Sequence, residues 1–155
     1  MTRILFVCMG NICRSPTVEA VARTEFSRAH VSAEVASAGT EAYHIGELVD
    51  PRSVRIAAAH GYPLAAHRAR QVDRADFTAF DHVLAMDRVN LRALQRFRPA
   101  QGGCVPALFL GEDEVADPYY GTDADFEQVV ALAQRGVGAL IERLRGRPSP
   151  ATGNA

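Results

Sequence analysis

The chain has 155 residues, of which 48% are apolar, and its formal net charge is −1. These values fit one globular domain with a substantial core, and the balanced charge argues against a nucleic-acid partner. No apolar run approaches the ~20 residues that a membrane span requires, and the N-terminus lacks the basic leader of a signal peptide. We therefore expect a cytoplasmic protein with reduced thiols and without a membrane span.

The predicted strands are short apolar runs. Residues 3–8 form a continuous apolar run that ends at a glycine-containing turn, which is typical of a strand buried on both faces. Three further segments have the composition of strands: residues 31–39, 81–86 and 104–110. Pro106 cannot donate a ladder hydrogen bond, so the last of these strands is expected at a sheet edge.

The predicted helices lie between these strands. Ser15 is expected to cap the first helix, with Pro16 at its first position, where a missing N–H costs nothing. Asp87 is expected to cap another helix. Further helices are predicted over residues 53–60 and from 123 onward, the last carrying one apolar stripe. Gly136 and Gly138 are candidate positions for a bend in it.

Alternating strands and helices predict an α/β domain with a parallel sheet over residues 1–146, followed by a disordered tail over residues 147–155. In such sheets ligands bind beyond the carboxyl ends of the strands. The loop after residue 8 and the loop around Asp117 should therefore open on the same edge.

The sequence "VCMGNICRSP" after the first strand predicts a phosphate-binding loop. Gly10 and Asn11 tolerate positive φ, so the backbone N–H groups can point inward, and the helix start adds further donors. Arg14 can close this ring with a planar fork that holds two oxygens. Cys8 lies at its root, where the same donors would stabilise the thiolate needed for nucleophilic attack. The Ser15 hydroxyl can donate to that sulfur.

Two other site types do not fit this loop. A Walker A loop is excluded because the chain has no Gly-Lys-Ser/Thr motif. A zinc site is disfavoured because Cys8 and Cys13 lack a second ligand pair at a suitable spacing.

The same stretch resembles the signature of the low-molecular-weight protein tyrosine phosphatases. The resemblance continues through "SAGT", "GELVDPR", "HGYPLAAHRARQV", "FDHVLAMDRVNLRAL" and "DPYYG", and so covers nearly the whole chain. It implies a flavodoxin-like four-stranded parallel sheet, order 2-1-3-4, with helices on both faces. It also implies metal-independent hydrolysis of phosphotyrosine through a cysteinyl-phosphate, without a cofactor.

The resemblance assigns three catalytic roles. Cys8 matches the nucleophile, Arg14 the phosphate-binding arginine and Asp117 the general acid. The chemistry itself requires such an acid, because the tyrosyl oxygen must be protonated as its bond breaks, and the same carboxylate can then activate water. Pro118 restricts the backbone of Asp117 to extended values, which would help to aim it.

Further residues match supporting positions of the family. The phosphate loop itself comprises Met9, Gly10, Asn11, Ile12 and Cys13. Asn11, Ser15 and His67 resemble a hydrogen-bonded set that holds the loop, while Tyr43, Tyr119 and Tyr120 would form the substrate rim. Cys13 matches a second cysteine that could form a reversible disulfide with Cys8. Asp50 and Arg52 match a pair that ties the 40s loop to the core.

Three alternatives are weighed against this interpretation. An arsenate reductase would need relay cysteines, but none lies between Cys13 and Cys104. A protein arginine phosphatase carries a threonine where this loop has Ile12, and a non-catalytic phosphate-binding module would be expected to lack Cys8 or Asp117. The expected partners are a phosphotyrosine-containing protein, with a tyrosine kinase as one candidate, and inorganic phosphate or other oxyanions in the loop.

Overall fold

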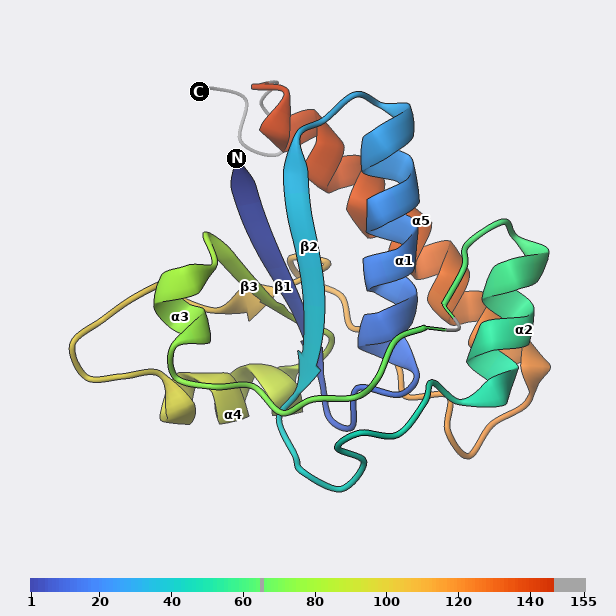
Figure 1. Cartoon of the computed structure of the whole chain (residues 1–155), viewed down its shortest axis with the longest axis horizontal. Coiled ribbons are helices and arrows are strands. Elements are labelled where there is room, and N and C mark those ends of the chain that lie inside the picture. The colour runs from blue at the N-terminus through green and yellow to red at the C-terminus, as the bar shows by residue number, and fades with distance from the viewer. Residues whose placement is uncertain (65, 147–155) are drawn as a thin grey trace.

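The computed structural model describes residues 1–64 and 66–146, and these form a four-stranded parallel sheet in the order β2-β1-β3-β4 (Figure 1). This confirms the predicted flavodoxin-like sheet. The strands are β1 (Thr2–Cys8), β2 (Ala33–Gly39), β3 (His82–Ala85) and β4 (Ala107–Leu108). The single domain over residues 1–146 stays a prediction, and the predicted tail over 147–155 lies outside the described residues.

Strand β1 is central because its side chains are apolar on both faces. Ile4, Leu5, Phe6 and Val7 are fully buried, and β1 pairs with β2 on one side and β3 on the other. Strand β4 lies at the sheet edge, as predicted, but it spans only two residues after Pro106 and not the whole of residues 104–110.

Helices cover both faces of the sheet (Figure 1). One face carries α1 (Arg14–Arg28) and α5 (Asp123–Leu144), with α2 (Pro51–Ala59) packed beside α5. The other face carries α3 (Asp76–Ala79) and α4 (Arg88–Phe97). The two layers enclose separate apolar clusters, one around Phe6 and the other around Leu5, because neighbouring strand residues point to opposite faces. None of the described helices is long and apolar enough to cross a membrane.

The predicted start of α1 is wrong. The helix begins at Arg14, no side chain caps it, and Pro16 is its third residue instead of its first. The Ser15 hydroxyl is unavailable as a cap because it turns toward Cys8. The predicted cap at Asp87 is confirmed, since its carboxylate accepts from the N–H of Asn90.

Three further features differ from the sequence prediction. Helix α2 begins at Pro51 and is capped by Asp50, and the four-residue helix α3 was not predicted. Helix α5 runs unbroken through Gly136 and Gly138. A Cβ atom at Gly136 would overlap the ring of Phe109, so this glycine allows a close contact between α5 and the residue that follows β4.

Candidate active site

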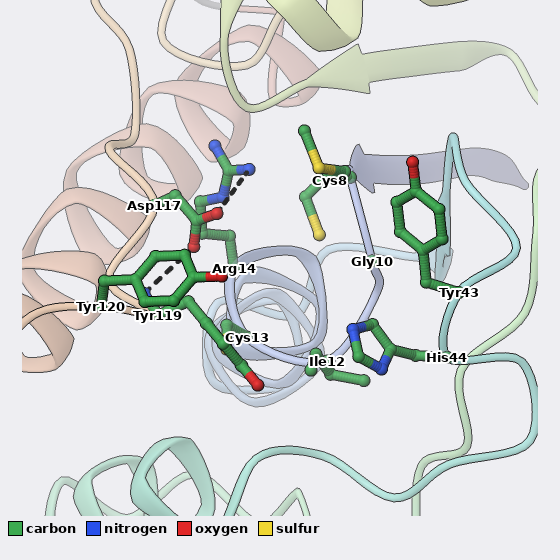
Figure 2. Close-up of a pocket in the computed structure, with 11 residues that line it drawn as sticks. Cys8, Gly10, Ile12, Cys13, Arg14, Tyr43, His44, Asp117, Tyr119 and Tyr120 are labelled. Atoms are coloured by element: carbon green, nitrogen blue, oxygen red, sulfur yellow. Dashed lines mark hydrogen bonds and ion pairs between the residues drawn. The ribbon is translucent and has the colours of Figure 1, made fainter.

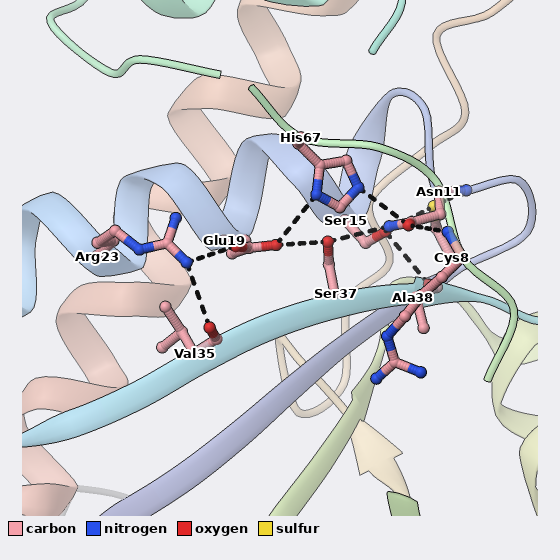
Figure 3. Close-up of polar contacts among 10 residues, drawn as sticks. Cys8, Asn11, Ser15, Glu19, Arg23, Val35, Ser37, Ala38 and His67 are labelled. Carbon is pink, nitrogen blue, oxygen red and sulfur yellow. Dashed lines mark hydrogen bonds and ion pairs between the residues drawn. The ribbon is translucent and has the colours of Figure 1, made fainter. Parts of the chain in front are cut away.

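A pocket of about 330 Å³ opens at the carboxyl ends of the strands (Figure 2). It contains both Cys8, at the end of β1, and Asp117, in the loop before α5, as the topology predicts. Ten of the thirteen predicted site residues line it: Cys8, Met9, Gly10, Ile12, Cys13, Arg14, Tyr43, Asp117, Tyr119 and Tyr120. The other three, Asn11, Ser15 and His67, belong to a hydrogen-bonded network behind the loop (Figure 3).

The loop between β1 and α1 is tightly folded. Asn11 takes the left-handed conformation, with φ of 59°. Gly10 does not adopt the positive φ that a glycine tolerates. Its missing side chain instead leaves room for His44, whose Cδ2 would lie 2.9 Å from a Cβ at this position. Gly39, at the end of β2, lets the loop approach closely, because a Cβ there would lie 2.6 Å from the carbonyl oxygen of Met9.

The sulfur of Cys8 lies at the bottom of the pocket and is surrounded by donors. Only 2% of the residue is exposed. The backbone N–H of Asn11 donates to Sγ at 3.3 Å, and the Ser15 hydroxyl lies 3.0 Å away. The Ser15 oxygen accepts from the Asn11 amide at 2.9 Å, and its one proton can be donated to the sulfur or to the carbonyl of Ala38, 3.4 Å away. This arrangement suits a negatively charged sulfur.

Asn11 fixes the loop through a fully satisfied side chain (Figure 3). Its amide nitrogen donates to the hydroxyls of Ser15 and Ser37, at 2.9 and 3.0 Å. Its amide oxygen accepts from the backbone N–H of Arg70 at 3.0 Å and lies 3.0 Å from Nε2 of His67. Since that oxygen can only accept, Nε2 of His67 must carry the proton.

The hydrogen-bonded network around Asn11 continues away from the pocket (Figure 3). The Ser37 hydroxyl donates to the carboxylate of Glu19 at 2.6 Å, and His67 Nδ1 lies 3.7 Å from the same carboxylate. Arg23 pairs with the other carboxylate oxygen at 2.6 Å and reaches the outer surface of the protein. Sequence reasoning missed Ser37, Glu19 and Arg70. The one available signal was the four-residue spacing of Glu19 from Ser15, which puts both on one helix face.

Arg14 is buried, and two hydrogen bonds from Nη1 hold its guanidinium in place. Its Nη1 donates to the Asp87 carboxylate at 2.7 Å and to the carbonyl of Val115 at 3.0 Å. Burial alone would lower the pKa of Arg14, but the sulfur of Cys8 and the carboxylate of Asp87 together raise it. Asp87 thus has two functions, because one oxygen caps α4 while the other orients the guanidinium.

Asp117 stands at the pocket mouth (Figure 2). Its Oδ2 lies 3.8 Å from Nη2 of Arg14, and its Oδ1 accepts from the backbone N–H of Tyr119 at 3.1 Å. The side chain is 47% exposed, so it can meet a leaving group as well as water. Tyr119 and Tyr120 follow it with their rings edge to face, at 4.9 Å between centroids.

The opposite rim consists of Tyr43 and His44 (Figure 2). Tyr43 is largely exposed, while His44 packs over Gly10 and lies 3.1 Å from the carboxylate of Glu47. Sequence reasoning missed His44, since a histidine in a polar loop gives no sign that it faces a pocket. The rim is therefore aromatic on both sides.

Cys13 carries a free thiol, as does Cys8. It is a buried residue of the loop, with its sulfur 3.9 Å from a carboxylate oxygen of Asp50. Burial, and next the negative charge of Asp50, raise the pKa of Cys13 to about 12. Cys13 is therefore held as the neutral thiol. The predicted disulfide between Cys8 and Cys13 stays a prediction.

Comparisons with known proteins agree with this geometry. A sequence profile of the family described as "Low molecular weight phosphotyrosine protein phosphatase" matches residues 3–148. A pig protein of that name is 39% identical over 92% of this chain and 95% of its own length, and the human protein is 40% identical over 90% and 94%. A low molecular weight protein-tyrosine-phosphatase of Streptomyces coelicolor is 39% identical over 92% of this chain and 93% of its own.

Solved structures show the same fold. A protein tyrosine phosphatase from Entamoeba histolytica superposes with a TM-score of 0.89 at 33% identity and covers 94% of this chain and 98% of its own. Vibrio vulnificus Wzb, solved in complex with benzylphosphonate, superposes with a TM-score of 0.82 at 29% identity, over 92% and 98%. The chain therefore belongs to the low molecular weight protein tyrosine phosphatase family. The predicted family and the predicted enzyme class, a cysteine-based protein tyrosine phosphatase, are confirmed.

Proposed function

We propose that the chain hydrolyses protein phosphotyrosine in two steps, through a phosphate carried by Cys8. The observation that carries the proposal is the placement of the Cys8 sulfur at the bottom of an arginine-closed pocket whose mouth holds a carboxylate. The phosphoryl oxygens would bind to the inward backbone N–H groups of the loop and to the guanidinium of Arg14. The phenyl ring would lie between the aromatic side chains of the rim.

In the first step the sulfur of Cys8 attacks phosphorus in line, and the bond from phosphorus to the tyrosyl oxygen breaks. Asp117, in its protonated form, gives its proton to that oxygen as the bond breaks. Arg14 stabilises the negative charge that spreads over the three remaining phosphoryl oxygens. The products are a cysteinyl-phosphate and a neutral tyrosine side chain.

In the second step a water molecule attacks the phosphorus of the cysteinyl-phosphate. Asp117, now a carboxylate, takes a proton from the water, and the bond from phosphorus to sulfur breaks. The sulfur leaves as a thiolate, stabilised by the Ser15 hydroxyl and by the N–H of Asn11. Inorganic phosphate leaves the loop, and Asp117 is again protonated for the next turnover.

Two features support phosphotyrosine as the substrate. The reacting sulfur is recessed beneath the pocket mouth, so a long flat side chain suits the depth and the aromatic rim. Ile12 lines the pocket with an apolar surface, which favours a phenyl ring over the charged guanidinium of phosphoarginine. The benzylphosphonate complex of the Vibrio relative is consistent with an aromatic phosphoryl ligand.

The test is hydrolysis of a phosphotyrosine peptide in excess EDTA, with the Cys8→Ser variant alongside. The proposal predicts turnover by the wild type, unaffected by EDTA, and none by the variant. A peptide that carries phosphoarginine serves as the competing substrate. Faster cleavage of that peptide would assign the chain to arginine dephosphorylation, and activity in Cys8→Ser would contradict the proposed nucleophile.

A further inference from the structure

Arg52 joins α2 to the loop that carries Asp117. Its Nε and Nη2 donate to the two carboxylate oxygens of Asp50, at 3.1 and 2.8 Å. The same Nη2 donates to the backbone carbonyl of Tyr119 at 3.0 Å. The guanidinium also lies over the ring of Phe126, 4.4 Å from its centroid, and 5.6 Å from that of Tyr119. Arg52 is therefore fixed by a carboxylate and an aromatic face while it holds a carbonyl of the acid loop.

The other end of this connection is the phosphate loop. The backbone N–H of Asp50 donates to the carbonyl of Ile12 at 2.9 Å. The carboxylate of Asp50 is also the acceptor for the thiol of Cys13, at 3.9 Å. Asp50 is 9% exposed, and Arg52 holds the pKa of its carboxyl below the ordinary value. A continuous set of contacts thus runs from the phosphate loop through Asp50 and Arg52 to Tyr119.

Asp117 lies between two anchored residues. On its N-terminal side, Val115 donates to the carbonyl of Met86 at 2.8 Å and accepts from Arg14 at 3.0 Å. On its C-terminal side, the carbonyl of Tyr119 accepts from Arg52. The side chain of Asp117 is half exposed and lies 3.8 Å from its nearest cationic partner, Arg14, so its position depends on the backbone around it.

We infer that Arg52 is a positioning residue for the general acid, because it fixes the loop of Asp117 at a set height above the phosphate loop. This inference rests on the proposed role of Asp117. The sequence comparison with the family predicted only that Asp50 and Arg52 tie the 40s loop to the core. The bond to Tyr119 adds a second function, since it couples that pair to proton transfer.

Arginine suits this position for a geometric reason. Its planar fork donates to a carboxylate and a carbonyl at once, and its face can stack on an aromatic ring. Lysine would keep the charge and could hold Asp50, but one ammonium cannot reproduce the paired bonds to the carboxylate together with the bond to Tyr119. We therefore expect Arg52→Lys to retain the fold and to lose part of the alignment of Asp117.

The inference predicts a particular kinetic defect. Displacing the general acid slows the first step little when the leaving group departs easily without a proton. It slows that step strongly when the leaving oxygen is basic and needs the proton. In the variant Arg52→Met, kcat/KM should fall more for phenyl phosphate than for p-nitrophenyl phosphate, so that the ratio of the two values changes by about 10-fold. Inhibition by inorganic phosphate should be nearly unchanged, because Arg52 is not among the residues that line the pocket.

The experiment measures kcat/KM for both substrates in the wild type, Arg52→Met, Arg52→Lys, Asp117→Asn and Arg55→Met. Asp117→Asn gives the ratio expected when the acid is absent. Arg55 is the matched control, since it lies one helical turn further along α2 and pairs with Asp123 on the surface, at 2.9 Å. The inference predicts that both Arg52 variants shift the ratio toward that of Asp117→Asn, and that Arg55→Met leaves it at the wild-type value.

Three outcomes would overturn the inference. A wild-type ratio in the Arg52 variants, with a shifted ratio in Asp117→Asn, would show that Arg52 does not position the acid. An unchanged ratio in Asp117→Asn would remove the acid role itself, and the inference with it. An equal shift in Arg55→Met would show that any loosening of α2 has this effect. If Arg52→Met fails to fold, Arg52→Lys decides the question by the same ratio.

Discussion

Asn11 offers a direct test of the network that holds the phosphate loop. It is fully buried, takes φ of 59°, and its side chain makes four hydrogen bonds, to Ser15, Ser37, His67 and the N–H of Arg70. At about 1 kcal/mol each, these bonds contribute about 4 kcal/mol. Alanine in the left-handed conformation costs about 1 kcal/mol more. We expect Asn11→Ala to lower the free energy of unfolding by about 5 kcal/mol, a large part of the roughly 5–15 kcal/mol typical of a domain.

Asn90 is the matched control for this substitution. It is the same residue type and is 1% exposed, but it lies in α4 and its side-chain amide has no hydrogen-bond partner among the described residues. Asn90→Ala removes no hydrogen bond and introduces a better helix former, so we expect a change within about 1 kcal/mol.

The assay is urea unfolding followed by circular dichroism, with kcat for p-nitrophenyl phosphate measured in parallel. Asn11→Ala should be both less stable and less active, whereas Asn90→Ala should keep most of its stability and activity. If the two variants lose the same free energy of unfolding, the network around Asn11 does not stabilise the loop, and the reasoning from its four bonds is refuted.

Three further predictions concern single contacts. Gly136→Ala should destabilise the fold by about 1–3 kcal/mol, because its methyl group overlaps the ring of Phe109, and an unchanged melting temperature would show that the helix shifts freely. With its pKa raised to about 12, Cys13 should resist alkylation by iodoacetamide at pH 8 in a Cys8→Ser background. Alkylated Cys13 in peptide mass spectrometry would contradict this prediction. Arg14→Lys should weaken competitive inhibition by inorganic phosphate about 10-fold or more, since an ammonium lacks the planar fork that donates to two phosphate oxygens in parallel; an equal inhibition constant would argue against bidentate binding.

The elements of the fold were predictable where one physical signal dominates. The apolar run over residues 3–8 predicted the buried first strand, Pro106 predicted that the last strand lies at an edge, and Asp87 was predicted as a helix cap. The strand order came from the family resemblance, because apolar patterning does not say which strands are neighbours. The four-residue helix α3 was missed, since it is too short to show a helical period.

The start of α1 was mispredicted because two interactions compete for one hydroxyl. Ser15 is a good helix cap by composition. In the folded protein its hydroxyl instead receives a hydrogen bond from Asn11 and faces the sulfur of Cys8. Only the tertiary structure brings these partners together, so local propensity could not reveal the outcome.

The candidate site was predicted from its local loop and from the family resemblance, which also indicated His67, but three further supporting residues were missed. Residues 8–15 are contiguous and carry their chemistry in their spacing. Ser37, Glu19 and Arg70 come from three separate segments and meet only because β2, α1 and the segment before α3 pack around Asn11. A serine in a strand or a glutamate on a helix looks ordinary in sequence. Such contacts depend on tertiary packing, which periodicity does not encode.

The most direct test of the proposed mechanism is to trap the phosphoenzyme. The enzyme is mixed rapidly with labelled p-nitrophenyl phosphate in EDTA, quenched in acid, digested and analysed by mass spectrometry, with Asp117→Asn used to slow the second step. The mechanism predicts phosphate on the sulfur of Cys8 at a level that rises in Asp117→Asn and vanishes in Cys8→Ser. Phosphate on another residue, or turnover without any phosphoenzyme, would contradict it.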